Sequence, residues 1–151
     1  MSEERAEIRQ CALTLLARRE HSSHELLQKL KTRGYTAAAV SPVLQELQHA
    51  GLQSDQRYTE DYIRSRVERG YGPLRIAMEL RQRGVAEEQI SDCMETCDVN
   101  WVERITAVRS KKFGPAVPAN YPAIMKQSGF LKYRGFSADL IRKLFRQGID
   151  D

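Results

Sequence analysis

The sequence predicts an all-α protein built from three tandem repeats of three helices each. The first observation is a pattern of residues that occurs three times at nearly constant spacing. The second is that apolar residues recur at helical spacing in every repeat, whereas no segment shows the sustained alternation of a strand. The third is composition: 41% of the 151 residues are hydrophobic and 29% are charged, which is typical of a globular chain with a buried core.

The repeated pattern is Leu, a cation, any residue, Arg and Gly, followed by an aromatic or apolar residue. It occurs at 30–35, 80–85 and 131–136, so its glycines are 50 and 51 residues apart. A fixed period of this kind is typical of tandem arrays. We therefore expect repeats at 1–53, 54–98 and 99–151. Six and ten residues after each glycine stand the apolar residues Val40 and Leu44, Ile90 and Met94, and Ile141 and Phe145.

The first repeat contains the signals of three short helices. Ser22 and Glu25 form a capping-box pattern that opens the middle helix, and Gly34 ends it. Pro42 is expected in the first turn of the third helix, because deeper in a helix it would cause a kink. The three apolar stripes are Ile8, Cys11, Ala12, Leu15 and Leu16; Leu26, Leu27 and Leu30; and Val40, Val43, Leu44 and Leu47.

The second and third repeats follow the same plan. Gly70 and Pro73 mark the turn before the second middle helix, and Asn100 with Glu103 caps the first helix of the third repeat. A loop rich in proline (115–122) precedes the last middle helix. The stripes expected to face inward are Tyr58, Tyr62, Ile63 and Val67; Leu74, Ile76, Ala77 and Leu80; Ile90, Cys93, Met94 and Cys97; Trp101, Ile105 and Val108; and Leu140, Ile141, Leu144 and Phe145.

The Arg–Gly pair that ends each middle helix is predicted to be a folding device. Gly84 can take the left-handed conformation that ends a helix, and Val85 can make the apolar contact that accompanies such an end. Arg83 lies in the last turn, where a cation stabilises the helix dipole by about 0.3–1 kcal/mol. Arg33 and Arg134 are expected to do the same in the other repeats.

Charge is distributed unevenly along the chain, although the net charge is only +4. Residues 100–149 contain ten Lys or Arg and two acids, whereas residues 85–99 contain five acids and no cation. This asymmetry indicates a surface for an acidic partner, either nucleic acid or an acidic protein groove. The alternative is a solvated helical surface whose balancing acids lie elsewhere.

No pattern typical of an enzyme, a metal site or a cofactor site occurs. The chain lacks a Walker-type phosphate loop, a dinucleotide motif and a G-x-S-x-G motif. Cys93 and Cys97 fall on an apolar stripe, so we expect them in the core. His21 and His24 flank a helix start, where we expect them to be exposed, and zinc-ligand spacings are absent. We predict a protein that is not an enzyme and needs no cofactor.

The chain shows no membrane or export signal. No run of about 18 apolar residues exists, and the first ten residues are charged and lack an apolar segment. Three cysteines without an export signal indicate reduced thiols. We therefore expect a cytoplasmic protein that does not bind a membrane.

The segment 62–85 carries a distinctive set of residues: Tyr62, Ile63, Arg66, Gly70, Tyr71, Gly72, Pro73, Ile76, Glu79, Leu80, Gly84 and Val85. This set closely resembles the central motif of the RecX regulatory proteins of bacteria. The segments 51–58, 111–114 and 130–136 resemble flanking blocks of the same family, so the resemblance extends from about residue 7 to 147. The departures are small, with Leu52-Gln53 where Leu-Asp is usual and Val85 where isoleucine is common.

The resemblance implies an elongated, curved array of three repeats that regulates the RecA recombinase and is not an enzyme. Such proteins bind RecA and its filament on single-stranded DNA, along the filament groove. They suppress ATP hydrolysis and strand exchange, and so modulate recombination and DNA repair. We expect a monomer whose basic residues can also bind DNA weakly and directly.

We assign the contacts with RecA or DNA to basic residues and one tyrosine. Arg66 has an alternative role, because it could instead hold a carboxylate such as Asp61 or Glu79. Tyr71 could stack on a base or a protein side chain, or pack over its own turn. The assigned residues are Arg64, Arg66, Arg69, Tyr71, Arg75, Arg81, Lys111, Lys112, Lys132 and Arg134.

Two other functions are compatible with the sequence. A helix, an Arg–Gly turn and another helix are typical of helix-turn-helix proteins that bind DNA directly. However, no helix shows the cluster of Asn, Gln and Arg expected for base readout. The second alternative is a generic α-repeat scaffold for another protein, which predicts no effect on a recombinase.

Overall fold

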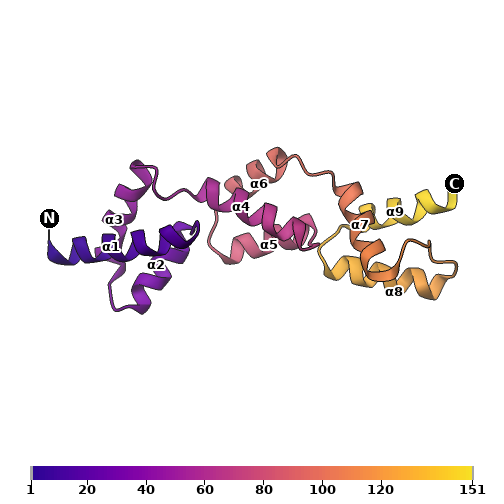
Figure 1. Ribbon diagram of the computed structural model, residues 1–151, viewed down its shortest axis with the longest axis horizontal. Coiled ribbons are helices and arrows are strands. Elements are labelled where there is room, and N and C mark those ends of the chain that lie inside the picture. The colour runs from indigo at the N-terminus through magenta and orange to yellow at the C-terminus, as the bar shows by residue number, and fades with distance from the viewer. Residues whose placement is uncertain (1, 151) are drawn as a thin grey trace. The chain divides into compact units, whose positions relative to one another are not determined.

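The computed structural model describes residues 2–150, and over this range it contains nine α-helices and no strand (Figure 1). The predicted all-α fold of three-helix repeats is confirmed. The helices are α1 (Glu3–Arg18), α2 (Ser23–Thr32), α3 (Ala37–His49), α4 (Asp55–Glu68), α5 (Pro73–Gln82), α6 (Glu87–Thr96), α7 (Trp101–Phe113), α8 (Tyr121–Tyr133) and α9 (Ala138–Asp150).

The chain forms two compact units. Unit 1 comprises the chain up to Tyr62 together with Leu80–Cys93. Unit 2 comprises Ile63–Glu79 together with the chain from Met94 onward. The second repeat therefore contributes residues to both units.

Each unit has a core of three mutually packed helices. In unit 1 these are α1, α2 and α3, and in unit 2 they are α7, α8 and α9. Trp101 packs edge-on against Phe136 in unit 2, with ring centres 6.5 Å apart. The buried hydrophobic residues of these two helix clusters are Ile8, Ala12, Leu15, Leu26, Leu30, Val40, Val43, Leu44 and Leu47 in unit 1, and Ile105, Val108, Leu131, Phe136, Ile141 and Phe145 in unit 2.

The ends of the middle helices have the predicted geometry. The N–H of Glu25 donates to Ser22 Oγ at 3.1 Å, and the N–H of Ser22 donates to Glu25 Oε1 at 3.2 Å, which completes the capping box. Gly84 has a φ of 78°, and the N–H of Val85 donates to the carbonyl of Leu80 at 3.1 Å. Left-handed glycines also end α2 and α8, at Gly34 and Gly135.

Two predictions are wrong: the place of Pro42 within α3, and the burial of Leu74 on α5. Pro42 lies inside α3, not in its first turn, because the helix already starts at Ala37. The missing N–H leaves the carbonyl of Ala38 without its helical partner, but Pro42 and Ala38 are both exposed, so water can bond to it. Leu74 is 59% exposed, because α5 buries Ile76 and Leu80 and Leu74 lies on the other side of the helix.

The prediction that His21 is exposed is also wrong. His21 is buried, whereas His24 is exposed as expected. The ring of His21 has partners on both sides: Nδ1 lies 3.1 Å from the carbonyl oxygen of Arg19, and Nε2 lies 2.9 Å from Lys29 Nζ. A buried polar group with both partners in place is tolerated in a core. Spacing alone could not predict this arrangement, because it depends on the packing of the loop before α2.

A buried arginine anchors the loop between α7 and α8. Arg109 Nη1 donates to the carbonyl of Ala116 at 3.2 Å and to Gln127 Oε1 at 3.3 Å, and Nη2 donates to the carbonyl of Pro115 at 3.3 Å. Arg109 therefore serves the fold of unit 2. The last proline of this segment, Pro122, lies in the first turn of α8 and not in the loop.

Candidate anion-binding site

Two turns of unit 2 dock on each other through glycines. The N–H of Gly72 donates to the carbonyl of Arg134 at 2.7 Å, and the N–H of Leu74 donates to the carbonyl of Gly135 at 3.0 Å. A Cβ on Gly72 would lie 2.5 Å from the backbone of Gly135, and a Cβ on Gly135 would lie 2.3 Å from Arg75 Cβ. Only glycine allows this approach at both positions. The end of α8 is thereby fixed against the start of α5.

Unit 1 contains the same kind of junction. Ser22 Oγ donates to the carbonyl of Arg83 at 3.1 Å, and a Cβ on Gly84 would lie 2.3 Å from the ring of His24. The Arg–Gly turns of the second and third repeats therefore each dock on the start of the preceding middle helix. A Cβ on Gly34, in the first repeat, would meet no atom within 4 Å.

Three guanidinium groups gather around the ring of Tyr71. The Cζ atoms of Arg66, Arg75 and Arg134 lie 3.9, 4.5 and 4.9 Å from the ring centre, within the range of cation–π attraction. Arg66 also forms a two-pronged ion pair with Glu79, with N···O distances of 3.1 and 2.8 Å. Both side chains of this ion pair are largely buried. The alternative role of Arg66, in holding a carboxylate, is thus present in the structure.

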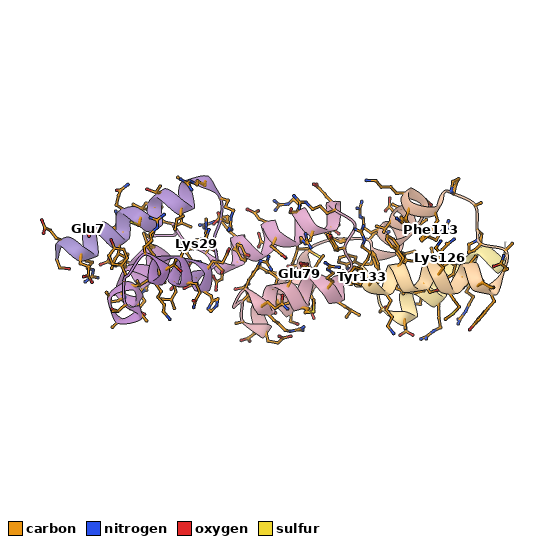
Figure 2. All side chains as sticks on the ribbon, turned by 90° about the horizontal axis from the view of Figure 1, so that it is seen from below. Glu7, Lys29, Glu79, Phe113, Lys126 and Tyr133 are labelled. Atoms are coloured by element: carbon orange, nitrogen blue, oxygen red, sulfur yellow. The ribbon has the colours of Figure 1, made fainter. Side chains whose placement is uncertain are left out.

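Arg75 links α5 to the end of α8. Its Nη1 donates to the carbonyl of Tyr133 at 3.3 Å, and its Cζ lies 5.1 Å from the centre of the Tyr133 ring. Tyr133 is 75% exposed and lies at the end of α8 (Figure 2). An exposed aromatic ring beside a guanidinium group can contact a base or a protein side chain.

A pocket of about 460 Å³ opens beside this cluster, and we call it the basic pocket. Three segments form its walls: the end of α4 with the following turn, one face of α7, and the end of α8. Five of the lining residues are cations and one is an acid. The lining residues are Glu68, Arg69, Gly70, Arg104, Ala107, Val108, Lys111, Lys112, Phe130 and Arg134.

Two partly buried arginines in the lining of the basic pocket donate hydrogen bonds to backbone carbonyls. Arg104 Nη2 donates to the carbonyl of Val67 at 2.7 Å, and Arg134 Nη1 donates to the carbonyl of Arg69 at 3.1 Å. Arg104 Nε is buried and has no hydrogen-bond partner among the described residues. These bonds position the guanidinium groups without neutralising their charge.

The structure brings most of the sequence-predicted residues together. Four of them (Arg69, Lys111, Lys112 and Arg134) line the basic pocket, and Arg66, Tyr71 and Arg75 form the adjacent cluster. The other three lie elsewhere. Arg64 is exposed on α4, Lys132 is exposed on α8, and Arg81 belongs to unit 1, where it forms an ion pair with Glu87 at 2.6 Å.

Sequence reasoning missed Arg104 and Phe130. Arg104, Val108 and Lys111 are spaced i, i+4 and i+7, so their helical spacing could have placed Arg104 on the lysine face of α7. Phe130 directly precedes the third copy of the repeated pattern. Its ring lies 5.1 Å from Arg134 Cζ and 5.7 Å from Lys112 Nζ.

Two other kinds of feature are absent from the described part of the chain. No group of three or more His, Cys, Asp or Glu side chains there is arranged to hold a metal ion. Within the same residues, no helix combines the length and the apolar character needed to cross a membrane.

Family models match all three parts of the chain. The models of the first, second and third three-helix domains of RecX match residues 9–47, 54–94 and 98–145. The chain belongs to the RecX family. A protein of Halorhodospira halophila named Regulatory protein RecX is 50% identical over 135 residues, which cover 89% of this chain and 84% of that protein. The Regulatory protein RecX of Legionella pneumophila (strain Corby) is 43% identical over 136 residues, covering 90% and 91%.

A solved RecX structure has the same fold. The crystal structure of RecX from Lactobacillus salivarius matches with a TM-score of 0.81 at 19% identity, covering 97% of each chain. At that identity the likeness shows the fold alone. The RecX relatives carry the name of a regulatory protein, and membership of the family supports a regulatory role in recombination.

Proposed function

We propose that this RecX protein binds the RecA recombinase and its filament on single-stranded DNA, and inhibits ATP hydrolysis and strand exchange. The observation that carries the proposal is the basic pocket with its five cations, together with the adjacent arginine–tyrosine cluster of unit 2. A nucleoprotein filament presents phosphates beside protein surface. The five pocket cations form no ion pair with a carboxylate of the described residues, and such cations are suited to this target.

The repeated architecture also supports a filament as the target. Tandem units can contact several successive protomers of a repeating partner, so that many weak contacts act together. We propose that the protein acts as a monomer in the cytoplasm, by binding and without catalysis of its own. No cofactor is required for this function.

Strand exchange tests the proposal. RecA is allowed to exchange a single strand with a homologous duplex at increasing concentrations of the RecX protein, and the product is quantified. Inhibition well below one molecule per RecA protomer supports the proposal. Unchanged exchange, with helical folding verified by circular dichroism, contradicts it. Recovery of exchange on addition of excess single-stranded DNA would show that the protein only sequesters DNA, and this also contradicts it.

A further inference from the structure

We propose that the outer face of α8 is a docking surface for an acidic amphipathic helix of a partner protein. The inference rests on the proposed function in one respect, because it takes that helix to belong to a RecA protomer. It adds to the proposed function the surface that makes a protein contact and the chemistry of the segment that fits this surface.

The outer face of α8 exposes a ridge of aromatic and apolar residues to solvent. Tyr121, Met125, Gly129 and Tyr133 are spaced four residues apart, so they lie in one row along the helix. Tyr121 is 72% exposed and Met125 is 52% exposed, and Tyr133 ends the row (Figure 2). The inward face of the same helix buries Leu131. Tyrosine and methionine are enriched at protein interfaces, so this ridge is suited to a protein partner.

Gly129 leaves a gap within this ridge. A Cβ at this position would meet no atom within 4 Å, so the packing of unit 2 does not require a glycine here. Glycine also destabilises the interior of a helix relative to alanine. A glycine in an exposed ridge does have one use, because it lets a second helix cross closely and place a side chain in the gap. The gap therefore indicates a helical segment as the partner.

The charges on this face indicate the chemistry of the partner. Helix α8 contains two cations, Lys126 and Lys132, and no acid. Both lysines are exposed, and neither forms an ion pair with a carboxylate of the described residues. Arg75, which lies beside the Tyr133 ring, adds a third cation at the end of the ridge. These cations favour a helix with carboxylates beside its apolar side. They disfavour a second copy of this chain, because two such basic faces would repel each other.

Exposed apolar residues also lie on α5, which begins beside the end of α8. The N–H of Leu74 donates to the carbonyl of Gly135 at 3.0 Å, and this bond holds the first turn of α5 against the end of α8. Leu74 and Met78 are four residues apart and both are exposed. A partner that docks on the ridge can therefore contact two helices of unit 2.

Site-specific photo-crosslinking tests the inference. The photoreactive residue p-benzoylphenylalanine replaces Met125 in one protein and Ser91 in a control protein. Ser91 is an exposed residue of α6 in unit 1. Each protein is irradiated with RecA filaments on single-stranded DNA, and the crosslinked peptide is identified by mass spectrometry. We expect position 125 to crosslink to a helical segment of RecA that is rich in Asp and Glu, in several times the yield from position 91.

Gly129→Leu gives a second test, because it fills the gap without removing a helix contact. Leucine is a better helix former than glycine, so this variant should melt at or above the wild-type temperature. It should nevertheless require about tenfold more protein for half-inhibition of ATP hydrolysis by RecA, because the partner helix can no longer approach closely. The control, Ser91→Leu, adds the same side chain to an exposed position of α6 and should inhibit like the wild type.

Several outcomes would overturn the docking surface. These are equal crosslinking from positions 125 and 91, and a crosslink from position 125 to DNA, to a basic segment of RecA or to a second copy of the chain. Half-inhibition by Gly129→Leu at the wild-type concentration would overturn it as well.

Failure of this inference is distinguishable from failure of the proposed function. A protein that inhibits RecA but yields no crosslink from position 125 contradicts the docking surface alone. A protein that crosslinks to RecA from position 125 but leaves ATP hydrolysis and strand exchange unchanged contradicts the proposed inhibition alone.

Discussion

At the scale of single residues, the ion pair of Arg66 with Glu79 stabilises the fold of unit 2. It has two short N···O contacts and is largely screened from water, and the Arg66 guanidinium also lies on the Tyr71 ring. We predict that Arg66→Ala lowers the free energy of unfolding by about 2 kcal/mol, because it removes both hydrogen bonds that Arg66 donates to the largely buried Glu79 carboxylate. Urea unfolding followed by circular dichroism measures this loss.

Arg81→Ala is the matched control for that prediction. The ion pair of Arg81 with Glu87 has similar geometry, but both side chains are exposed. Water and salt screen such a pair, so its removal should leave the urea midpoint unchanged. Equal destabilisation by the two variants would contradict the structural role assigned to Arg66.

His21 gives the stability of unit 1 a dependence on pH. Burial lowers the pKa of the His21 ring, and the nearby positive charges of Arg19 and Lys29 lower it further, against the effect of the bond to the Arg19 carbonyl. The unfolded chain takes up its proton near the ordinary value of about 6.5, whereas the folded chain resists protonation until lower pH. Stability is therefore complete above the ordinary pKa, and is lost as the pH falls from that value toward the lowered one.

Urea midpoints at about pH 7.5 and about pH 5 test this prediction in the wild type and in His21→Gln, since these values lie on either side of the ordinary pKa. The wild type should lose more stability on acidification than the variant does, whatever the stability of the variant at neutral pH. The same pH dependence in both proteins would show that His21 is not the group responsible.

At the scale of helices and turns, the close contact between the Gly72 turn and the Gly135 turn predicts that a single added methyl group lowers stability strongly. Gly72→Ala places a Cβ 2.5 Å from the backbone of Gly135, and two backbone segments cannot easily move apart. The expected loss is about 1–3 kcal/mol, as for overpacking of a core. That corresponds to about 2–4 °C in melting temperature for each kcal/mol.

Gly129→Ala is the control for this junction. It makes the same chemical change inside α8, where a Cβ would meet nothing within 4 Å. Alanine is favoured over glycine in a helix by about 1 kcal/mol, so this variant should melt at a higher temperature than the wild type. If Gly72→Ala melted at the wild-type temperature, the close approach of the two turns would not exist in solution.

Alanine variants of Gly84 and Gly34 distinguish two causes of lost stability, the collision of a docked turn and the strain at a helix end. Both glycines have positive φ, so alanine is strained at either position, by about 1 kcal/mol. Only at Gly84 would the new Cβ also collide with another segment, at His24. We predict that Gly84→Ala lowers the melting temperature clearly more than Gly34→Ala. Equal shifts would mean that the Arg–Gly turn of the second repeat ends a helix and does not join two repeats.

At the scale of the whole molecule, the sequence predicted those features that depend on residues close to one another along the chain. Helical periodicity, the Ser22 capping box and the Arg–Gly helix ends are local, and the structure has all of them. The docking of those turns depends on contacts between segments about 60 residues apart, so the same residues could not reveal it. The burial of His21 was missed for the same reason. The repeat boundaries at 53/54 and 98/99 stay a prediction.

The candidate site was predictable to the extent that charge and spacing determine it. The excess of cations in the third repeat is a property of composition, and Lys111, Lys112 and Arg134 do lie at the basic pocket. Whether an arginine is neutralised by a carboxylate depends on tertiary contacts. Spacing therefore could not separate Arg81, which is ion-paired, from Arg104, which forms no ion pair with any residue that the structure describes.

ATP hydrolysis by RecA on single-stranded DNA, with the RecX protein titrated in, tests regulation of the recombinase most directly. We expect strong inhibition well below one molecule per RecA protomer, because one bound array affects several protomers or the end of a growing filament. The Lys111→Gln/Lys112→Gln variant should require a higher concentration than the wild type for the same inhibition, because it removes two exposed cations of the basic pocket. An unchanged rate of hydrolysis at equimolar protein, with the helical fold intact by circular dichroism, would contradict the proposed regulation of RecA.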